Sequence, residues 1–279
     1  MPINEDSAIV IRDIEQVSEV HAVEELQKEV WGLPGLDVVP LSHLVAVKAA
    51  GGVLLGAFDR ETLVGFVYGF VSYEYGQMAH HSHMLAVKSA YRNLNLGHEL
   101  KLAQRERVMA QGINLMTWTF DPLQSLNAYF NFNKLGVIAD QYKVDFYGAD
   151  ATSFLHRNGT DRLWAAWLLT SHRINERPVN PDVAHVTPLV QLQADDSPRR
   201  SSSDGLLQEQ ALIEIPANIN ELQQDSVELA FQWRAATRWA FTEALAAGYL
   251  VVDFCRQSRG DQQLGVYLLS RDKKLGDFA

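Results

Sequence analysis

Two periodicities of apolar residues alternate along the first part of the chain, and they predict strands and helices in turn. Continuous or alternating apolar runs bounded by short polar turns are typical of strands. Such strands are expected over residues 8–14, 52–59, 63–76, 81–89, 113–120, 137–148 and 161–169. Apolar residues three and four positions apart are typical of amphipathic helices, which are expected around residues 20–30 and over 41–50, 94–110 and 124–134.

The order of these elements indicates the fold class. Helices follow some of the predicted strands and hairpin turns follow others, which favours an α+β or α/β domain with a mixed, mostly antiparallel sheet flanked by helices. In the helix over 94–110, Leu96 and Leu100 are expected to face inward. The charged residues of that helix, Lys101 among them, are expected to face outward.

A change of composition divides the chain. Residues 193–205 (QADDSPRRSSSDG) are serine-rich and charged and lack large apolar side chains, so they are typical of a linker or mobile loop. We expect a first domain over 1–175, a linker or mobile loop over 176–206, and a smaller β-α-β-β region over 207–279. The helix at 227–247 is apolar around much of its circumference. We therefore expect it to be buried on more than one side, by its own sheet, by the first domain or by another subunit.

Charge and cysteine content narrow the function. The net charge is −10, so nothing favours binding to nucleic acid or to an anionic membrane. Cys255 is the only cysteine, which fits a reducing compartment, and its apolar neighbours favour a small buried side chain over a nucleophile. The first residues do not resemble a signal peptide, and no apolar stretch is long enough to span a membrane. A cytoplasmic protein is expected.

The stretch YRNLNLGHEL, residues 91–100, connects a predicted strand to a predicted helix. The first backbone amides of a helix lack partners, and with the positive end of the helix dipole they can bind a phosphate. Such loops need unusual dihedral angles, which asparagine tolerates best after glycine. We therefore expect left-handed conformations at Asn93 and Asn95, close approach of a ligand at Gly97, and a donor to phosphate at Arg92. The alternative is an ordinary turn into a helix.

The longer run LAVKSAYRNLNLGHEL resembles the acyl-CoA-binding motif of the GNAT acyltransferase superfamily, in which a strand LxV precedes YRGxGIGxxL. The matching residues are Leu85, Val87, Tyr91, Arg92, Gly97 and Leu100, whereas asparagines replace the first two glycines. NAYFNFNKLG is similar to the second motif of the family, AxxLYxKxGF, through Ala128, Lys134, Leu135 and Gly136. The resemblance extends from residue 8 to about residue 170 and includes the order of the elements.

This resemblance implies a GNAT-like fold with acetyl-CoA or another acyl-CoA as cosubstrate. Backbone amides of Leu94, Asn95, Leu96, Gly97 and His98 would bind the pyrophosphate, with Arg92 and Asn93 beside it. The strand at Leu85, Ala86 and Val87 would pair with the pantetheine amides, and a backbone amide near Ala86 would polarise the thioester carbonyl. Ser125 or Asn127 would contact the pantetheine arm or the adenosine.

The acid and base of such a reaction are less defined by the motifs. The family often has a tyrosine as general acid where this chain has Phe132, and Tyr129 or Tyr147 is the candidate replacement. His81 and His83 alternate on one face of their strand, and a histidine suits a base near neutral pH. A polar strand edge is the alternative for these histidines. No metal is expected, because no cysteine or carboxylate accompanies them at zinc-like spacing.

Three further residues are candidates at the ends of later strands. Asp121 ends a central strand, where sheets expose ligand-binding residues, although Asp-Pro also starts turns. Arg162 would clamp a carboxylate of the acceptor or of the acyl group, and Asp161 accompanies it. The alternative for Asp161 and Arg162 is a surface ion pair.

These observations predict an enzyme that transfers an acetyl or succinyl group from acyl-CoA directly to a small primary amine, such as an amino acid. Its partners would be this small molecule and a second copy of the chain in a homodimer. The alternative is a CoA-binding sensor or assembly module without catalysis, which the phenylalanine at position 132 would suit.

Overall fold

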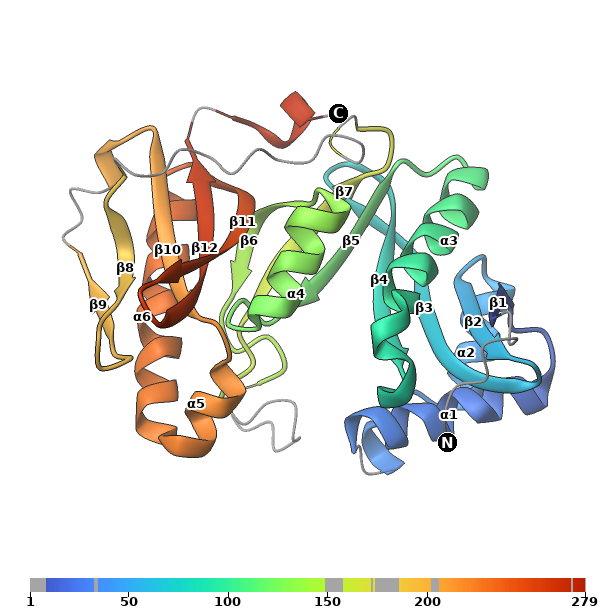
Figure 1. Ribbon diagram of the computed structural model, residues 1–279. Helices are drawn as coiled ribbons and strands as arrows, with labels where there is room; N and C mark the ends of the chain where they lie inside the picture. Colours follow the sequence, from blue (N-terminus) through green and yellow to red (C-terminus); the bar gives the residue numbers. More distant parts are fainter. Residues whose placement is uncertain are drawn as a thin grey trace. The chain divides into compact units, whose positions relative to one another are not determined.

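The computed structural model describes residues 9–32, 35–148, 158–171, 173, 186–201, 206–271 and 273–278. Over these residues the chain forms two compact units, one ending at Trp118 and the other beginning at Thr119 (Figure 1). The boundary between the two units lies within a strand, β5 (Leu115–Phe120).

The first unit is a sheet with helices on both faces. Four strands pair antiparallel in chain order: β1 (Ile9–Asp13), β2 (Val53–Asp59), β3 (Thr62–Glu74) and β4 (Gln77–Val87). The parallel strand β5 follows β4. The helices are α1 (Val17–Trp31), α2 (Leu41–Ala49) and α3 (Leu96–Ala110), and the 3-10 turns are η1 (Gly35–Asp37) and η2 (Ser89–Leu94).

Side-chain alternation along β3 assigns the helices to opposite faces. Phe66 and Tyr68 pack in one buried cluster with Leu26 of α1 and Leu44 of α2. Gly65, the residue before Phe66, lies against Leu100 of α3. Since neighbouring residues of a strand point to opposite faces, α3 covers the face that α1 and α2 leave open.

Strand β4 contains a bulge that shifts this alternation. Tyr68 and Gly69 of β3 pair with Met84 and Ser82, so that His83 is the extra residue. Before the bulge, Ser82 faces α3, as its hydrogen bond to Gln104 of that helix shows. After the bulge, Ala86 joins the cluster beneath α1 and α2. The bulge therefore changes which residues face α3, from Ser82 before it to Leu85 after it.

The second unit contains the remaining elements. Its strands follow one another in the sheet as β7 (Arg162–Leu168), β6 (Ile138–Lys143), β11 (Leu250–Arg259), β12 (Gln262–Ser270), β10 (Gln210–Pro216), β8 (Pro188–Leu192) and β9 (Pro198–Arg200). Its helices are α4 (Ser125–Tyr129), the π-helical turn η3 (Phe130–Lys134), α5 (Ile219–Asp225), α6 (Val227–Ala246) and the 3-10 turn η7 (Leu275–Phe278). Only β8 and β10 pair parallel among the described pairs of this unit.

Part of the expected linker is regular structure. Strands β8 and β9 form a hairpin, and Leu189, Val190 and Leu192 are buried. The apolar half of this hairpin precedes the serine-rich stretch, so the composition of residues 193–205 alone concealed it. Residues 202–205 of the stretch lie outside the described residues.

Helix α6 is less buried within its own unit than its composition suggested. Trp233, Phe241 and Ala240 are fully buried, but the row through Val227 and Phe231 is about half exposed. Within this unit, α6 is therefore buried on one broad side, and its other apolar side chains are partly exposed.

The predicted fold class is confirmed: both units combine a mostly antiparallel sheet with flanking helices. No helix in the described ranges has the length and apolarity that a membrane crossing requires.

Candidate functional site

The loop before α3 takes the conformation that one of its two asparagines was expected to supply. Asn95 is left-handed, with φ 59° and ψ 13°, and it stands at the N-cap of α3. Asn93 does not have a positive φ, so the expectation of a second left-handed residue was wrong. The 3-10 turn η2 brings the chain round to α3, so one left-handed residue is enough to start the helix.

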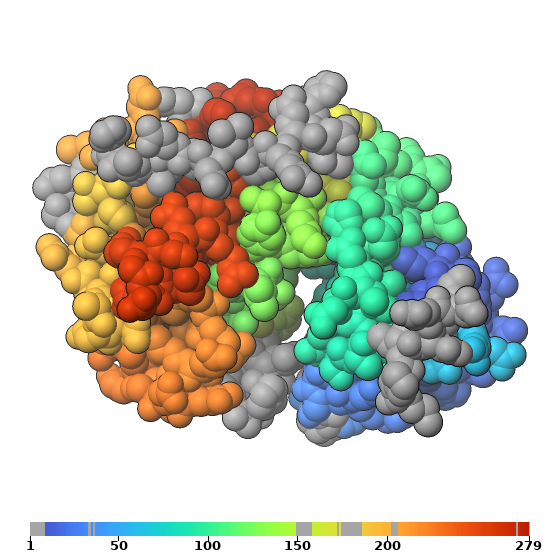
Figure 2. Space-filling view, viewed as in Figure 1, coloured from blue at the N-terminus to red at the C-terminus, as the bar shows by residue number. Residues whose placement is uncertain are grey.

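The first turn of α3 follows this left-handed residue directly, and Figure 2 shows the helix in teal and green on the face drawn. The amides of His98 and Glu99 donate to the Asn95 carbonyl at 3.0 and 3.2 Å. The amides of Leu96 and Gly97 precede them, and helix geometry offers these two no carbonyl four residues back. A Cβ at position 97 would be 3.5 Å from Leu85 Cδ2, an ordinary contact, so packing within the protein does not require glycine there. Close approach of a ligand would.

Two side chains anchor the loop to the sheet. The Tyr91 hydroxyl donates to Asp59 Oδ2 at 2.8 Å, a bond that raises the pKa of Tyr91. Arg92 Nε donates to the Val87 carbonyl at 3.4 Å, and the Arg92 side chain is otherwise exposed. Arg92 thus lies at the start of the loop, and its contact with phosphate stays a prediction.

Strand β4 leaves one backbone edge open next to this loop. The Lys88 amide donates to the Val64 carbonyl of β3. Because backbone groups alternate along an antiparallel strand, Ala86 also faces β3, whereas Leu85 and Val87 face the other edge. Acceptance of the Arg92 bond by the Val87 carbonyl agrees with this. The amide that could meet a thioester is therefore that of Leu85 or Val87, and the assignment near Ala86 shifts by one residue.

The neighbouring strand β5 pairs with only the first part of β4. The pairs given by the register are His80 with Met116 and His81 with Thr117. Beyond them, the described backbone of β4 from Ser82 to Val87 has no β5 partner. An extended chain carrying amides could add to such an edge by hydrogen bonding.

His81 belongs to a relay at the point where this pairing ends. Its Nδ1 lies 2.9 Å from Thr117 Oγ1, and the Thr117 hydroxyl donates to Glu74 Oε1 at 2.7 Å. Since Thr117 has a single proton, which Glu74 accepts, His81 Nδ1 must be the donor of the first bond. The basic lone pair is then on Nε2.

The relay ends on a carboxylate that stays ionised. Burial raises the pKa of Glu74, but hydrogen bonds from His81, Thr117 and Ser72 outweigh this and lower it to about 2. The negative Glu74 also lies beside His81 directly, with 3.7 Å between Oε1 and Nδ1. This is the arrangement that a general base requires.

His83 lies beside His81 in a cluster of five rings. The ring centroids are 6.4 Å apart, and both imidazoles contact Phe70, at 5.4 and 5.9 Å. Tyr68 and His43 complete the cluster. Desolvation beside these rings, together with His81 and His43, lowers the pKa of His83 to about 4, although the residue is exposed. The two histidines share a face as predicted, and His81 has the contacts of a base.

The opposite face of β4 carries a buried polar chain that the sequence did not reveal. Lys101 Nζ donates to Ser82 Oγ at 2.7 Å, and Ser82 donates to Gln104 Oε1 at 2.8 Å. Gln104 Nε2 lies 3.2 Å from His80 Nε2. Burial, Lys101 and His81 lower the pKa of His80 to about 3, so its neutral ring can accept this bond. Lys101, expected to face outward, is only 4% exposed.

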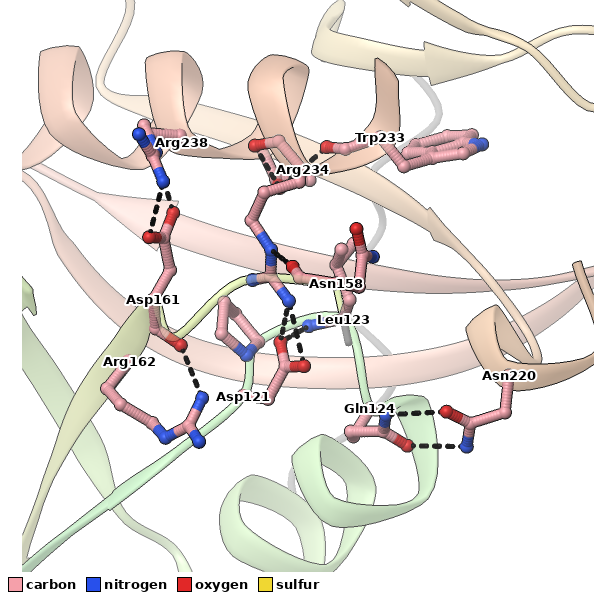
Figure 3. Close-up of polar contacts among 12 residues, drawn as sticks. Asp121, Leu123, Gln124, Asn158, Asp161, Arg162, Asn220, Trp233, Arg234 and Arg238 are labelled. Carbon is pink, nitrogen blue, oxygen red and sulfur yellow. Dashed lines mark hydrogen bonds and ion pairs between the residues drawn. The ribbon is translucent and has the colours of Figure 1, made fainter. Parts of the chain in front are cut away.

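The remaining predicted residues lie in the second unit, where Asp121 is part of an ion pair. Both carboxylate oxygens accept from Arg234 Nη2 at 2.8 Å (Figure 3). Asp121 Oδ1 also accepts from the Leu123 amide at 3.0 Å, which is the turn-capping alternative considered for Asp-Pro. Arg234 Nε donates to the Asn158 carbonyl at 2.7 Å. These contacts favour a structural role for Asp121.

Asp161 and Arg162 are not a surface pair. Asp161 is fully buried and accepts from Arg238 Nε and Nη2 and from the Tyr142 hydroxyl. Arg162 Nη1 donates to the Asp161 carbonyl instead of its carboxylate (Figure 3). Burial lowers the pKa of Arg162, although Asp121 and Tyr147 favour its charge. Arg238, from α6, is the partner that sequence spacing did not indicate.

Four candidates around α4 and β6 have different surroundings. Ser125 is 2% exposed, and its hydroxyl forms no hydrogen bond with the described residues. Asn127 is exposed and Tyr129 half-buried. Tyr147 is 46% exposed, with its ring 5.2 Å from the Arg162 guanidinium. Phe132 is fully buried against Tyr267, so packing explains a phenylalanine there.

Among known proteins, similarity was found to solved structures only at the level of the fold. No protein family matches the sequence, and no curated protein does. An aminoglycoside 6'-acetyltransferase type Ii matches with 19% identity and a TM-score of 0.46, over 57% of this chain and 97% of that chain. The ribosomal-protein-S18-alanine N-acetyltransferase from Escherichia coli matches with 12% identity and a TM-score of 0.47, over 58% and 94%. The aminoglycoside 6'-N-acetyltransferase from Enterococcus faecium matches with 17% identity and a TM-score of 0.44, over 61% and 99%. Each likeness concerns the fold of part of this chain.

The order of elements from β1 to β7 is the one that the resemblance to the GNAT superfamily implied. Two helices follow β1, three antiparallel strands precede the loop–helix, and a strand, a helix and two strands follow it. Over this part the chain has a GNAT-like fold.

Proposed function

We propose that the protein is an acyl-CoA-dependent N-acyltransferase. The open edge of β4 supports this most directly, because it runs into the loop that starts α3. Leu85 and Val87 supply edge groups of the kind that pair with an extended amide chain, and Leu96 and Gly97 supply amides at a helix N-terminus. A molecule with a diphosphate at one end of an amide-containing arm fits this sequence of groups. Coenzyme A is such a molecule.

The reaction proposed is direct transfer to a primary amine. The neutral amine nitrogen attacks the thioester carbonyl carbon, the C–S bond breaks, and the CoA thiolate leaves. A thiolate is a good leaving group without strong acid assistance, which is consistent with Phe132 in place of a tyrosine. His81 Nε2 takes the proton that the amine loses, and Glu74 stabilises the imidazolium through Thr117 and by charge.

The amide of Leu85 or Val87 would stabilise the oxyanion that develops on the carbonyl oxygen. The acceptor we propose is a small primary amine. The idea of an amino acid acceptor or a succinyl donor rested on Arg162, whose Nη1 donates to a backbone carbonyl.

Binding and turnover test the proposal separately. Acetyl-CoA, succinyl-CoA and CoA should each raise the thermal midpoint of the protein, because a ligand that binds the native state stabilises it. Absence of any shift at millimolar concentration would contradict the proposal. Thiol release from acyl-CoA, measured with a panel of small amines, then tests for catalysis. Clear binding without turnover on any amine would favour the alternative, a CoA-binding module.

His81→Gln tests the assignment of the base. The variant should keep its thermal shift with acetyl-CoA but lose about 10²–10⁴-fold in the rate of thiol release, the usual contribution of a general base. His21→Gln is the matched control, because His21 is an exposed histidine of α1 whose ring contacts Glu24 of the same helix. If His81→Gln retained full activity, another group would be the base.

A further inference from the structure

Strands β4 and β5 separate at a defined pair of residues. His81 and Thr117 form the last pair, so Ser82 and Trp118 are the first residues past the junction. In a regular parallel pair the backbone hydrogen bonds would continue past this point, with the two strands about 4.8 Å apart. The open edge needed for an amide-containing arm begins at this point.

One side chain of α3 contacts both residues at this junction. Lys101 Nζ donates to Ser82 Oγ at 2.7 Å and lies 3.7 Å from the centroid of the Trp118 ring. Its contacts with β4 and β5 therefore fall one residue beyond the last backbone pair on each strand. The Lys101 side chain therefore connects the two strands at the point where their backbone hydrogen bonding ends.

Lys101 is an unusual choice for packing alone. The side chain is 4% exposed, and among the described residues it forms no ion pair. Burying a charged or strongly polar group without a carboxylate is unfavourable, and an apolar residue of similar volume often serves stability as well or better. Methionine would fill this volume. The polar head is thus best explained by the position at which it holds Ser82 and Trp118.

Lys101 also connects the junction to the phosphate loop. It is on α3, one turn after the Leu96 and Gly97 amides, and Leu100 beside it is fully buried against the sheet. The Ser82–Gln104 bond fixes a second point of the same helix to β4. These contacts therefore fix the distance between the start of α3 and the beginning of the open edge of β4.

We infer that Lys101 is a positioning residue that keeps β4 and β5 apart at Ser82 and Trp118, so that the edge at Leu85 and Val87 stays open to the arm of acyl-CoA. This rests on the proposed function. Its specific consequence concerns the arm: binding of the nucleotide end depends on the loop and the helix start, whereas binding of the pantetheine end depends on the open edge.

The test compares two ligands by calorimetry. One is acetyl-CoA, and the other is adenosine 3'-phosphate 5'-diphosphate, which has the nucleotide and diphosphate but no arm. In Lys101→Met the affinity for acetyl-CoA should fall at least tenfold, while the affinity for the fragment should stay within about twofold of wild type. Ser82→Ala should act in the same direction, and the double variant should lose less than the product of the two single losses. Arg107→Met, which removes an exposed cation of the same helix, is the control and should leave the ratio unchanged.

The outcomes separate this inference from the proposed function. Equal losses for both ligands in Lys101→Met, or no loss for either, overturn the positioning role while leaving acyl-CoA binding by the wild type intact. If the wild type binds neither ligand, the proposed function fails and the role of Lys101 fails with it. Circular dichroism confirms folding, and Ser82→Ala decides the matter alone if Lys101→Met does not fold.

Discussion

Each unit of the protein contains a buried basic residue on one of its long helices, and the two side chains are satisfied in different ways. Arg234 of α6 meets both oxygens of Asp121 at 2.8 Å and the Asn158 carbonyl at 2.7 Å. Lys101 of α3 meets a hydroxyl, Ser82, and the face of an aromatic ring, Trp118. The first is a charge-neutral pair in which one guanidinium nitrogen, Nη2, donates to both carboxylate oxygens. The second has no counter-charge among its described contacts.

The ionisation of the two side chains reflects this difference. Burial lowers the pKa of Arg234, but Asp121 and Tyr142 outweigh it and the pKa is raised overall. Burial lowers the pKa of Lys101 far below its ordinary value, with no carboxylate to oppose it. The arginine therefore contributes to holding its unit together, whereas the lysine is tolerated at a cost, which is typical of a residue kept for function.

The largest expected effect comes from breaking the arginine pair. Asp121→Asn leaves Arg234 buried without its counter-charge, and removing one partner of a buried pair costs about 3–5 kcal/mol. Urea unfolding should show this loss. Asp145→Asn is the control, since Asp145 pairs with Arg238 where both side chains are about a third exposed, and it should cost under about 1 kcal/mol. A stable Asp121→Asn protein that has lost activity would instead support the catalytic role predicted for Asp121.

A smaller effect is expected at the far end of the lysine's polar chain. Gly69 of β3 lies against His80 and Gln104, and a Cβ there would be 2.4 Å from His80 Nε2 and 2.6 Å from the His81 carbonyl. Because a backbone atom is involved, the clash cannot be relieved by a side chain alone. Gly69→Ala should destabilise the protein by about 1–3 kcal/mol in urea unfolding. Gly35→Ala, with nothing within 4 Å, is the control and should have little effect. Equal stability of the two variants would mean that the β3–β4 pair adjusts easily.

Much of the fold followed from the sequence because periodicity reports local structure. The strand at 81–89 and the helix at 94–110 overlap β4 and α3 closely, and Asn95 is the left-handed residue that the loop needed. Periodicity failed where tertiary contacts override it. Lys101 has the spacing of an outward residue, and only the neighbouring Ser82 and Trp118 explain its burial.

The candidate site was predictable as a loop but not as a network. The motif resemblance located the helix start and β4 correctly. It placed the oxyanion amide near Ala86, which faces β3. Which residues of β4 direct their amides towards β3 depends on how the two strands pair, and the sequence of one strand does not show this. It missed Glu74 and Thr117, which reach His81 from two other strands. Arg234 and Arg238 pair with aspartates more than 70 positions away, a separation that spacing rules do not cover.

The smallest effect sharpens the comparison most. Lys101→Met replaces the unpaired cation with an apolar side chain of similar volume, while Ser82 keeps its bond to Gln104. We expect the free energy of unfolding at pH 7 to change by about 1 kcal/mol or less, in contrast to Asp121→Asn. The stabilities of wild type and Lys101→Met should also differ in their dependence on pH.

In the unfolded chain Lys101 binds its proton up to its ordinary pKa of 10.5, whereas in the native state it releases the proton at lower pH because its pKa is lowered. Between these values the unfolded state binds more protons, so the stability of the wild type should rise relative to Lys101→Met as pH increases towards 10.5. Urea unfolding at pH 7, 8.5 and 10 measures the difference, in which other titrating groups cancel. A difference that stays constant over this range would show that buried Lys101 keeps its proton, held by Ser82 and the Trp118 ring.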